Sequence, residues 1–308
     1  MTIMKRTLCA AAFVLALLPS LALAQDYVKG RTAYEAGDYA MALKELQPLA
    51  DQGNAGAEFY LGRMYDFGMG VPKDDAKAVI FYRKAADQGY GYAEWALGGM
   101  YMIGSGVPQD YAEAAIWEQK AANQGLPEAQ ISLAFLYENG WGVPQDYAMA
   151  AFWYRKAANQ GIDSAQSVLG AMYANGRGVP QDWVEAAFWF RKAADQGDFV
   201  AMTSLGQLYD TGRGVLQDYD EAIRLYRKAA GGGAADGQYF LGTMYLEGKG
   251  VQQDYVAAHM WFNLASARGS ESASKSRDDT ATKMTSEQVA EAQRRARVCM
   301  ASNYQNCD

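Results

Sequence analysis

The chain has 308 residues, 50% of them hydrophobic and 13% aromatic, which is enough to build a continuous buried core. Its 28 basic and 35 acidic residues give a formal net charge of −7, which argues against nucleic acid and anionic membrane surfaces as partners. The single histidine, His259, excludes metal sites made of histidine pairs and leaves any Ser-His-Asp system dependent on one residue. We expect His259 to be a structural or surface residue.

Residues 1–24 have the features of a secretory signal peptide. Lys5 and Arg6 precede an apolar run over residues 8–18, and a small-x-small cleavage site ends at Ala24. The apolar run is too short to serve as a membrane anchor. We therefore predict cleavage after Ala24, a periplasmic or secreted protein, and no membrane insertion of the mature chain. Loss of the two basic residues lowers the net charge to −9, from 26 basic and 35 acidic residues.

Residues 25–53 are predicted to form an N-terminal capping unit of two helices. Tyr34 lies four residues before Asp38, whereas Tyr65 lies nine residues before Asp74 in the segment that follows. The opening unit therefore lacks the long loop that the later segments contain.

From residue 54 onward the sequence repeats with a period of 36 residues. Such a period indicates a stack of two-helix units, because each unit needs the same contacts with its neighbour. One tyrosine returns at that interval in every unit: Tyr65, Tyr101, Tyr137, Tyr173, Tyr209 and Tyr245. We call the units repeats 1 to 6: 54–89, 90–125, 126–161, 162–197, 198–233 and 234–269.

Repeat 3 shows the pattern of each unit. Its first half places Ala129, Leu133 and Leu136 on one stripe of an amphipathic helix, with Tyr137 beside them. A glycine or alanine next to the leucine predicts a close backbone crossing at that point. We interpret the recurring tyrosines as internal packing, because burial of one such ring removes about 150–250 Å² from water.

A loop reading G-x-G-V-P-Q-D in repeats 2 to 4 follows the first helix. Gly140 and Gly142 can take the positive φ values that end a helix and turn the chain. Pro144 stops the helix and Asp146 is placed to cap the next one. In repeats 2, 4 and 5 the capping aspartate is followed three residues later by glutamate, which predicts a capping box.

Residues 270–308 are predicted to form a closing helical cap. Residues 285–288 read as a capping box for a last helix that runs to about Ala301. Cys299 and Cys307 survive processing, and in an oxidising compartment they can pair within the chain. Two free thiols, or pairing between chains, remain open alternatives.

The repeats closely resemble the Sel1-like repeat family, a branch of the tetratricopeptide-like helical repeats. The pattern A-x3-L-G-x2-Y-x2-G-x-G-V-P-Q-D-Y-x2-A-x3-Y-x-K-A-A-x2-G is nearly complete in each unit and covers 216 of the 284 residues left after processing. No segment alternates with period two, so we predict an all-α chain. The resemblance implies a right-handed α-solenoid of antiparallel helix pairs, with first helices along its inner curve, and an opening unit like an ordinary tetratricopeptide pair.

The resemblance also implies a function. Similar proteins serve as interaction scaffolds in envelope assembly, signalling or host contact, so we predict an exported, non-enzymatic adaptor with a protein or peptide partner and no catalytic residue, metal or cofactor. The alternative is a protein that binds or hydrolyses cell-wall fragments or β-lactams. Relatives linked to that activity carry a bridging cysteine pair in nearly every unit, and the six repeats here contain no cysteine.

Outward positions that vary between repeats are where a partner would dock. In repeats 1 to 3 these positions are mostly apolar, whereas later repeats are more polar, for example at Ser167 and Thr203. An apolar strip with polar borders is typical of a docking surface. The alternative is that some of these side chains are buried between units or under the opening unit. The predicted site consists of Phe59, Arg63, Trp95, Met102, Ile131, Phe135 and Trp141.

Overall fold

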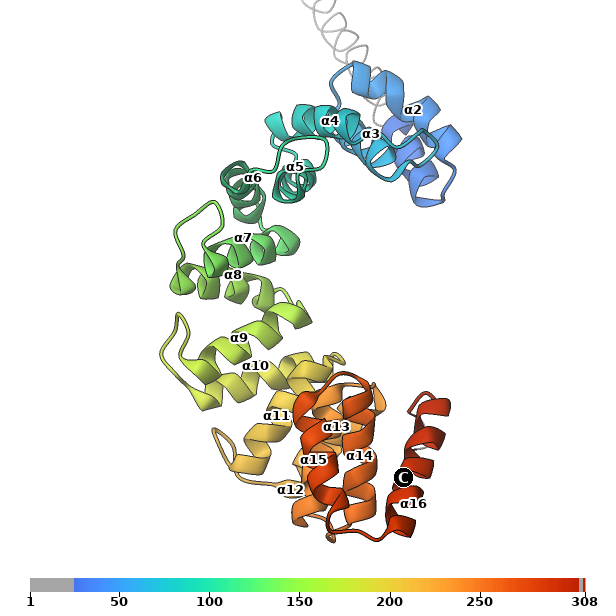
Figure 1. The fold of residues 1–308 in the computed structure, drawn as a ribbon. Helices are drawn as coiled ribbons and strands as arrows, with labels where there is room; N and C mark the ends of the chain where they lie inside the picture. The colour runs from blue at the N-terminus through green and yellow to red at the C-terminus, as the bar shows by residue number, and fades with distance from the viewer. Residues whose placement is uncertain (1–24, 305–306, 308) are drawn as a thin grey trace, which may run out of the picture. The chain divides into compact units, whose positions relative to one another are not determined.

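The computed structural model describes residues 25–304 and residue 307 (Figure 1). The proposed signal peptide, residues 1–24, lies outside the described residues and stays a prediction. The chain divides into two compact units, Met1–Asp146 and Tyr147–Asp308, which we call unit 1 and unit 2. Over the described residues the chain consists of helices joined by short loops and contains no strand, so the all-α prediction is confirmed.

Unit 1 opens with a helical segment over residues 25–35, which packs with α2 and α3 through Tyr34, Leu46 and Leu61. Each helix of this unit then packs against the next one along the chain. The helices are α2 Tyr39–Asp51, α3 Ala55–Phe67, α4 Asp75–Asp87, α5 Gly91–Ile103, α6 Tyr111–Asn123 and α7 Pro127–Asn139.

Unit 2 continues the same arrangement and ends with two helices that both pack against α14. Within it, the helices from α8 to α15 each pack against the next one along the chain. Its helices are α8 Tyr147–Asn159, α9 Asp163–Asn175, α10 Trp183–Asp195, α11 Phe199–Thr211, α12 Tyr219–Gly231, α13 Ala235–Glu247, α14 Tyr255–Ala267, α15 Glu271–Ala281 and α16 Ser286–Ala301.

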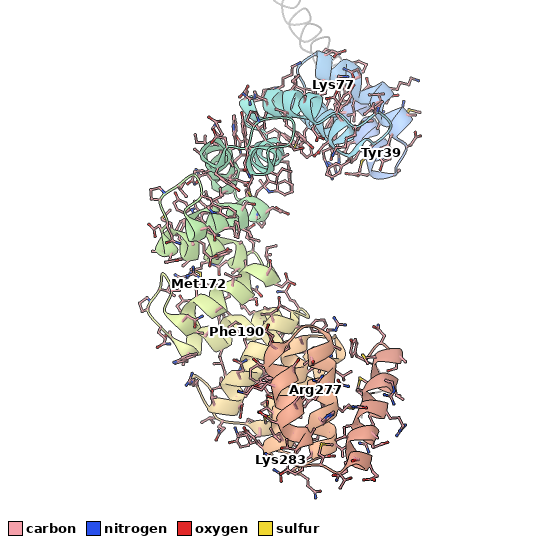
Figure 2. The ribbon with its side chains drawn as sticks, in the orientation of Figure 1. Tyr39, Lys77, Met172, Phe190, Arg277 and Lys283 are labelled. Atoms are coloured by element: carbon pink, nitrogen blue, oxygen red, sulfur yellow. A yellow bond between two sulfur atoms is a disulfide. The ribbon has the colours of Figure 1, made fainter. Side chains whose placement is uncertain are left out.

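In repeats 1, 4, 5 and 6 the small residue of the first helix makes room for an aromatic ring. A Cβ added at Gly62 of α3 would lie 2.6 Å from the ring of Tyr82 on α4. Gly170 of α9 faces the ring of Phe190 on α10 in the same way. Figure 2 labels Phe190 together with Met172 of α9, and both side chains are buried. The predicted close crossing of two backbones is therefore corrected to a helix with a pocket for an aromatic ring.

The recurring tyrosines are half-buried, so the prediction of purely internal packing was too strong. The rings of five of them contact the core clusters, and the hydroxyl groups of four, Tyr101, Tyr173, Tyr209 and Tyr245, reach arginines of the preceding repeat. Arg191 donates a hydrogen bond to the hydroxyl of Tyr209, and Arg227 to that of Tyr245, both at 2.8 Å. Each of these four tyrosines thus links two repeats through an apolar ring and a polar tip.

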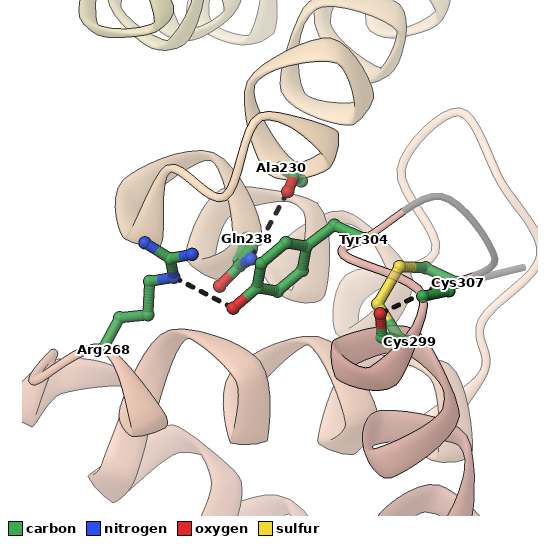
Figure 3. The surroundings of a disulfide bond; sticks show 7 residues. Ala230, Gln238, Arg268, Cys299, Tyr304 and Cys307 are labelled. Atoms are coloured by element: carbon green, nitrogen blue, oxygen red, sulfur yellow. Dashed lines mark hydrogen bonds between the residues drawn. A yellow bond between two sulfur atoms is a disulfide. The ribbon is translucent and has the colours of Figure 1, made fainter.

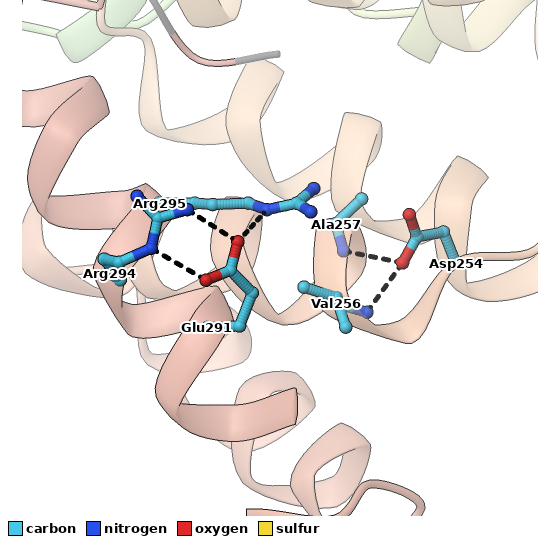
Figure 4. Close-up of polar contacts among 6 residues, drawn as sticks. All are labelled: Asp254, Val256, Ala257, Glu291, Arg294 and Arg295. Atoms are coloured by element: carbon cyan, nitrogen blue, oxygen red, sulfur yellow. Dashed lines mark hydrogen bonds and ion pairs between the residues drawn. The ribbon is translucent and has the colours of Figure 1, made fainter. Parts of the chain in front are cut away.

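The loop aspartates of repeats 1, 2, 4, 5 and 6 cap the second helices, as predicted, but those of repeats 2, 4 and 5 do not form capping boxes. The Asp110 carboxylate accepts hydrogen bonds from the backbone N–H groups of Ala112 and Glu113. Its own backbone N–H donates to the carbonyl of Tyr101, 3.0 Å away, and is not available to the Glu113 side chain. Figure 4 shows the cap at Asp254, which accepts from Val256 and Ala257 at 2.8 and 3.0 Å.

The C-terminal helices carry a true capping box and a cysteine pair. The Thr285 hydroxyl accepts from the Gln288 N–H, and the Gln288 side chain accepts from the Thr285 N–H at 2.9 Å. Cys299, fully buried on α16, is joined to Cys307 by a disulfide with a Cα–Cα distance of 4.5 Å (Figure 3). Between them Tyr304 accepts a hydrogen bond from Arg268 at 3.0 Å, which ties the chain end to α14.

Candidate partner-binding site

Phe59 is buried, so the prediction that it faces a partner is wrong and the burial alternative holds there. Its side chain is 6% exposed, and its ring centroid lies 5.3 Å from that of Tyr90 and 6.0 Å from that of Tyr82. These rings come from α4 and from the residue before α5, so Phe59 joins repeats 1 and 2. Ser167 and Thr203, at the same position in repeats 4 and 5, are also buried, 7% and 4% exposed.

Arg63 is half-buried on α3 and contacts aromatic rings of its own unit. Its guanidinium carbon lies 5.6 Å from the ring centroids of both Tyr34 and Phe67. Tyr34 belongs to the N-terminal capping segment, residues 25–53, so Arg63 helps to hold that segment against repeat 1. A partner would meet this arginine already stacked between two rings.

The α5 members of the predicted site lie on one face of the helix, with a glycine between them. Trp95 and Met102 are half-buried and seven residues apart, a spacing that places them on the same face. Gly99 lies between them, and a Cβ added there would meet no neighbouring atom within 4 Å. At the end of the helix Ile103 is 71% exposed. This face therefore offers apolar side chains on both sides of an open glycine position.

Phe135 and Trp141 are brought together at the surface of unit 1. Each is 39% exposed, and their ring centroids lie 5.2 Å apart with nearly perpendicular planes. The indole of Trp141 also lies 5.0 Å from the ring of Tyr111 on α6. Ile131, one turn before Phe135 on α7, is half-buried. We call Tyr111, Phe135 and Trp141 the aromatic cluster.

Tyr111 is not among the site residues predicted from the sequence. It lies 30 residues before Trp141, and residues with this spacing are in contact in other repeats as well. The second residue of the glycine loop contacts the first residue of the second helix one repeat earlier. Thus Trp141 contacts Tyr111, Arg177 lies 4.1 Å from the ring of Tyr147, and the Ser105 hydroxyl donates to Asp75 at 2.7 Å. Repeat 3 carries the only tryptophan at this loop position.

Two buried carboxyl groups lie on the helices next to this surface. Glu94 of α5 accepts a hydrogen bond from the Gln124 amide at 2.8 Å, and burial raises its pKa against the opposing effects of Lys120 and that hydrogen bond. Glu118 of α6 is fully buried, and neither of its carboxylate oxygens has a hydrogen-bond partner. Burial alone raises the pKa of Glu118 well above its usual value. Both groups are enclosed within the repeats and do not reach a surface.

His259 is a buried residue of α14. It is 3% exposed, and its Nδ1 atom has no hydrogen-bond partner. Burial lowers its pKa, and the nearby charge of Arg277 lowers it further while Asp278 opposes them. Over residues 25–304, no three histidine, cysteine, aspartate or glutamate side chains are placed to hold a metal ion. In the same range, no helix is both long and apolar enough to cross a membrane.

Comparison with known proteins places this architecture in a family. The sequence profile of the Sel1 repeat matches six stretches: residues 55–90, 91–126, 127–162, 163–198, 200–233 and 235–270. No curated protein matches the chain at a significant level.

Two solved structures are similar to the chain over most of its length. The first is a protective antigen of uropathogenic Escherichia coli strains with an SLR fold, at 38% identity and a TM-score of 0.74 over 85% of this chain. The chain spans only 56% of that antigen. The second is a Sel1 repeat protein of Oxalobacter formigenes, at 31% identity and a TM-score of 0.68, covering 78% of this chain and 96% of the other. With six matched repeats and these two likenesses, the chain belongs to the Sel1 repeat family, and its fold is an α-solenoid.

Proposed function

We propose that this chain is an exported, non-enzymatic scaffold that binds a protein or peptide partner through the aromatic cluster of unit 1. The observation that carries the proposal is the pair Phe135 and Trp141, which contact each other at the surface while remaining 39% exposed. Large aromatic side chains that meet outside the core are typical anchors of protein interfaces. Trp95, Met102 and Ile131 would form the border of the same surface.

The family supports a protein partner. Sel1 repeat proteins generally act as protein-interaction scaffolds. Phe59 and Arg63 of the predicted site contact aromatic rings within unit 1. The proposed docking surface is therefore restricted to α5, α6, α7 and the loop that carries Trp141. A partner that presents apolar side chains would approach the backbone closely at Gly99 and cover the exposed rings.

Export is the second part of the proposal. It is supported by the signal-like residues 1–24, by the Cys299–Cys307 disulfide, which an oxidising compartment would preserve, and by the relative described as a protective antigen. The antigen is similar over only part of its own length, so its role comes to this chain as a suggestion for the repeats alone.

The docking surface is tested with a double variant, Phe135→Ala with Trp141→Ala. Envelope proteins captured by the full chain are identified, purified one at a time and titrated against wild type and variant. Loss of two anchor rings should raise the Kd by roughly 30-fold or more, since a hot-spot residue contributes about 2 kcal/mol or more. Phe188→Ala is the matched control, because Phe188 is an exposed ring of α10 that meets Trp189 edge-on.

The surface is misassigned if the folded double variant keeps the wild-type Kd for every partner. The non-enzymatic part is tested separately with the purified full chain, β-lactams and cell-wall fragments. Turnover that follows the polypeptide through purification would contradict it and favour the cell-wall alternative.

A further inference from the structure

Repeat 5 contains a pocket on the side of α12 that faces α10. The cavity has a volume of about 340 Å³, near the lower end of the range for small-molecule sites. Leu225 of α12 and Met202 and Leu205 of α11 supply its apolar lining. Glu221 and Lys228, one turn before and about one turn after Leu225, supply polar groups at its rim.

The pocket lies where other repeats carry an indole. At the position of Leu225, repeats 2, 3, 4 and 6 have tryptophan, and repeat 1 has phenylalanine. All four indoles are buried, with exposed fractions between 3% and 8%. Leucine is smaller than tryptophan, so repeat 5 leaves part of this space unfilled. The aligned residues are Phe81, Trp117, Trp153, Trp189, Leu225 and Trp261.

Repeat 4 shows how the indole is held at this position. The Trp189 Nε1–H donates a hydrogen bond to the Glu185 carboxylate at 3.2 Å. The ammonium group of Lys192 lies 5.2 Å from the centroid of the Trp189 ring. The indole therefore spans the space between a carboxylate on one side and a lysine on the other.

Repeat 5 keeps both of these polar groups without the ring. Glu221 and Lys228 lie 36 residues after Glu185 and Lys192, and both line the pocket. The ammonium group of Lys228 has no ion pair, hydrogen bond or ring contact with any described residue, whereas Lys192 lies over an indole. The site thus has the carboxylate, the cation and the cavity, but its own chain does not supply the ring.

The other two basic groups at the rim, Arg191 and Arg224, are already paired. Arg224 makes two hydrogen bonds to Glu221, at 2.6 and 2.5 Å, and Arg191 donates to the Tyr209 hydroxyl at 2.8 Å. A carboxylate that accepts from one arginine retains lone pairs for a further donor. Of the three basic side chains that line the pocket, Lys228 is the one left to interact with a ligand.

We propose that the pocket of repeat 5 binds a tryptophan side chain of a partner polypeptide. The ring would lie beside Leu225 with its face toward the Lys228 ammonium, and its N–H would donate to Glu221. The occupant is argued from the chain itself, because four repeats fill the equivalent space with a tryptophan side chain, and repeat 4 holds that side chain between a carboxylate and a lysine. This site is in unit 2 and is independent of the aromatic cluster.

The proposal is tested with 5-fluoro-N-acetyltryptophanamide as the probe, whose binding to the full chain is followed by fluorine NMR. Wild type should broaden and shift the probe signal in a saturable way. Leu225→Trp fills the cavity with the residue of the other repeats, so it should keep the fold and weaken binding by at least about tenfold. Lys228→Met should weaken binding by roughly fivefold, because it removes the cation over the ring.

Lys192→Met is the matched control, since that ammonium lies over its own indole and should not affect the probe. Unchanged binding to a folded Leu225→Trp variant, or no saturable binding to wild type, would overturn the proposal. Equal affinity for fluorinated N-acetylphenylalaninamide would also overturn it, because that ring has no N–H for Glu221. The double variant Phe135→Ala with Trp141→Ala should bind the probe normally, so failure of the unit 1 surface and failure of this pocket are distinguishable.

Discussion

Glu118 stands where every other repeat carries an aromatic ring. It is fully buried, its carboxylate oxygens have no hydrogen-bond partner, and its Cγ lies 3.0 Å from the position of a Cβ at Gly98. Burial without partners disfavours the charged form of a carboxyl, and this raises the pKa of Glu118 well above its usual value. The rings at the equivalent positions are Tyr82, Tyr154, Phe190, Tyr226 and Phe262.

Replacing Glu118 by phenylalanine should stabilise the protein at neutral pH. The pKa of Glu118 is higher in the folded than in the unfolded chain. The contribution of Glu118 to the free energy of unfolding is therefore fully present below pH 4.5, the ordinary pKa of glutamate, and is lost as the pH rises through the pKa of the folded state. Glu118→Phe removes this loss and fills the space beside Gly98, as Phe190 does beside Gly170. We expect a gain of roughly 1–3 kcal/mol at pH 7, the usual cost of a buried unsatisfied group.

Denaturant unfolding between pH 4.5 and pH 8 measures this effect. The variant should lose less stability than wild type as the pH rises. Glu113→Gln is the control, since Glu113 lies on the same helix but is only half-buried. An unchanged dependence on pH in Glu118→Phe would show that Glu118 is already solvated or paired in solution.

At the residue scale, whether the sequence predicts an environment correctly depends on whether the contacting residues lie close together in the chain. The six aligned repeats identify Glu118 as an exception without any structure. They did not identify Phe59 as buried, because the rings that cover it come from Tyr82 and Tyr90, beyond its own helix. A variable position faces outward only if no neighbour is large enough to cover it.

At the scale of helices and loops, unit 1 requires a glycine at one position and has room for a side chain at another. Gly142 has φ of +70°, and a Cβ added to it would lie 2.0 Å from the backbone oxygen of Tyr111. Gly99 lies inside α5, and a Cβ added there would meet nothing within 4 Å. The loop glycine therefore allows two backbones to approach, whereas the helical glycine only adds freedom to the unfolded chain.

Alanine substitutions at these glycines should change stability in opposite directions. Gly99→Ala should stabilise by about 0.5–1 kcal/mol, the difference between glycine and alanine inside a helix. Gly142→Ala should destabilise by more than about 1 kcal/mol, because the loop must move away from Tyr111 and leave its favourable φ. Thermal unfolding of the two variants compares them directly. A Gly142→Ala variant as stable as wild type would show that the close approach of Gly142 to Tyr111 does not persist in solution, and a destabilised Gly99→Ala variant would contradict the open position of Gly99.

Helices, caps and glycine turns were predictable because their signals lie within one repeat. The apolar stripes, the φ values of Gly140 and Gly142, and the aspartate caps all follow from residues a few positions apart. The capping boxes were wrong because the Asp110 N–H is taken by the carbonyl of Tyr101, nine residues earlier. The aromatic cluster was predicted only in part, since the contact of Trp141 with Tyr111 joins different repeats.

For the whole molecule, contacts run between helices that are close in sequence. In unit 2, α13 packs against α12 and α14, and α14 also contacts the closing helices α15 and α16. A chain with this contact pattern behaves as a row of coupled units, in which damage to one unit weakens its neighbours first. Stability is therefore expected to vary along the chain.

Phe262→Ala tests this expectation at a fully buried ring of α14. The ring packs at Gly242 of α13, and its removal should cost roughly 3–5 kcal/mol because a cavity remains. Hydrogen exchange should show the largest loss of protection in α13 and α14, a smaller loss in α12, and little change in α9 and α10. Val298→Ala, at an exposed residue of α16, is the control for small changes near the C-terminus. Equal loss of protection in every helix of unit 2 would mean that the unit unfolds as one cooperative block, and the description by neighbouring repeats would fail.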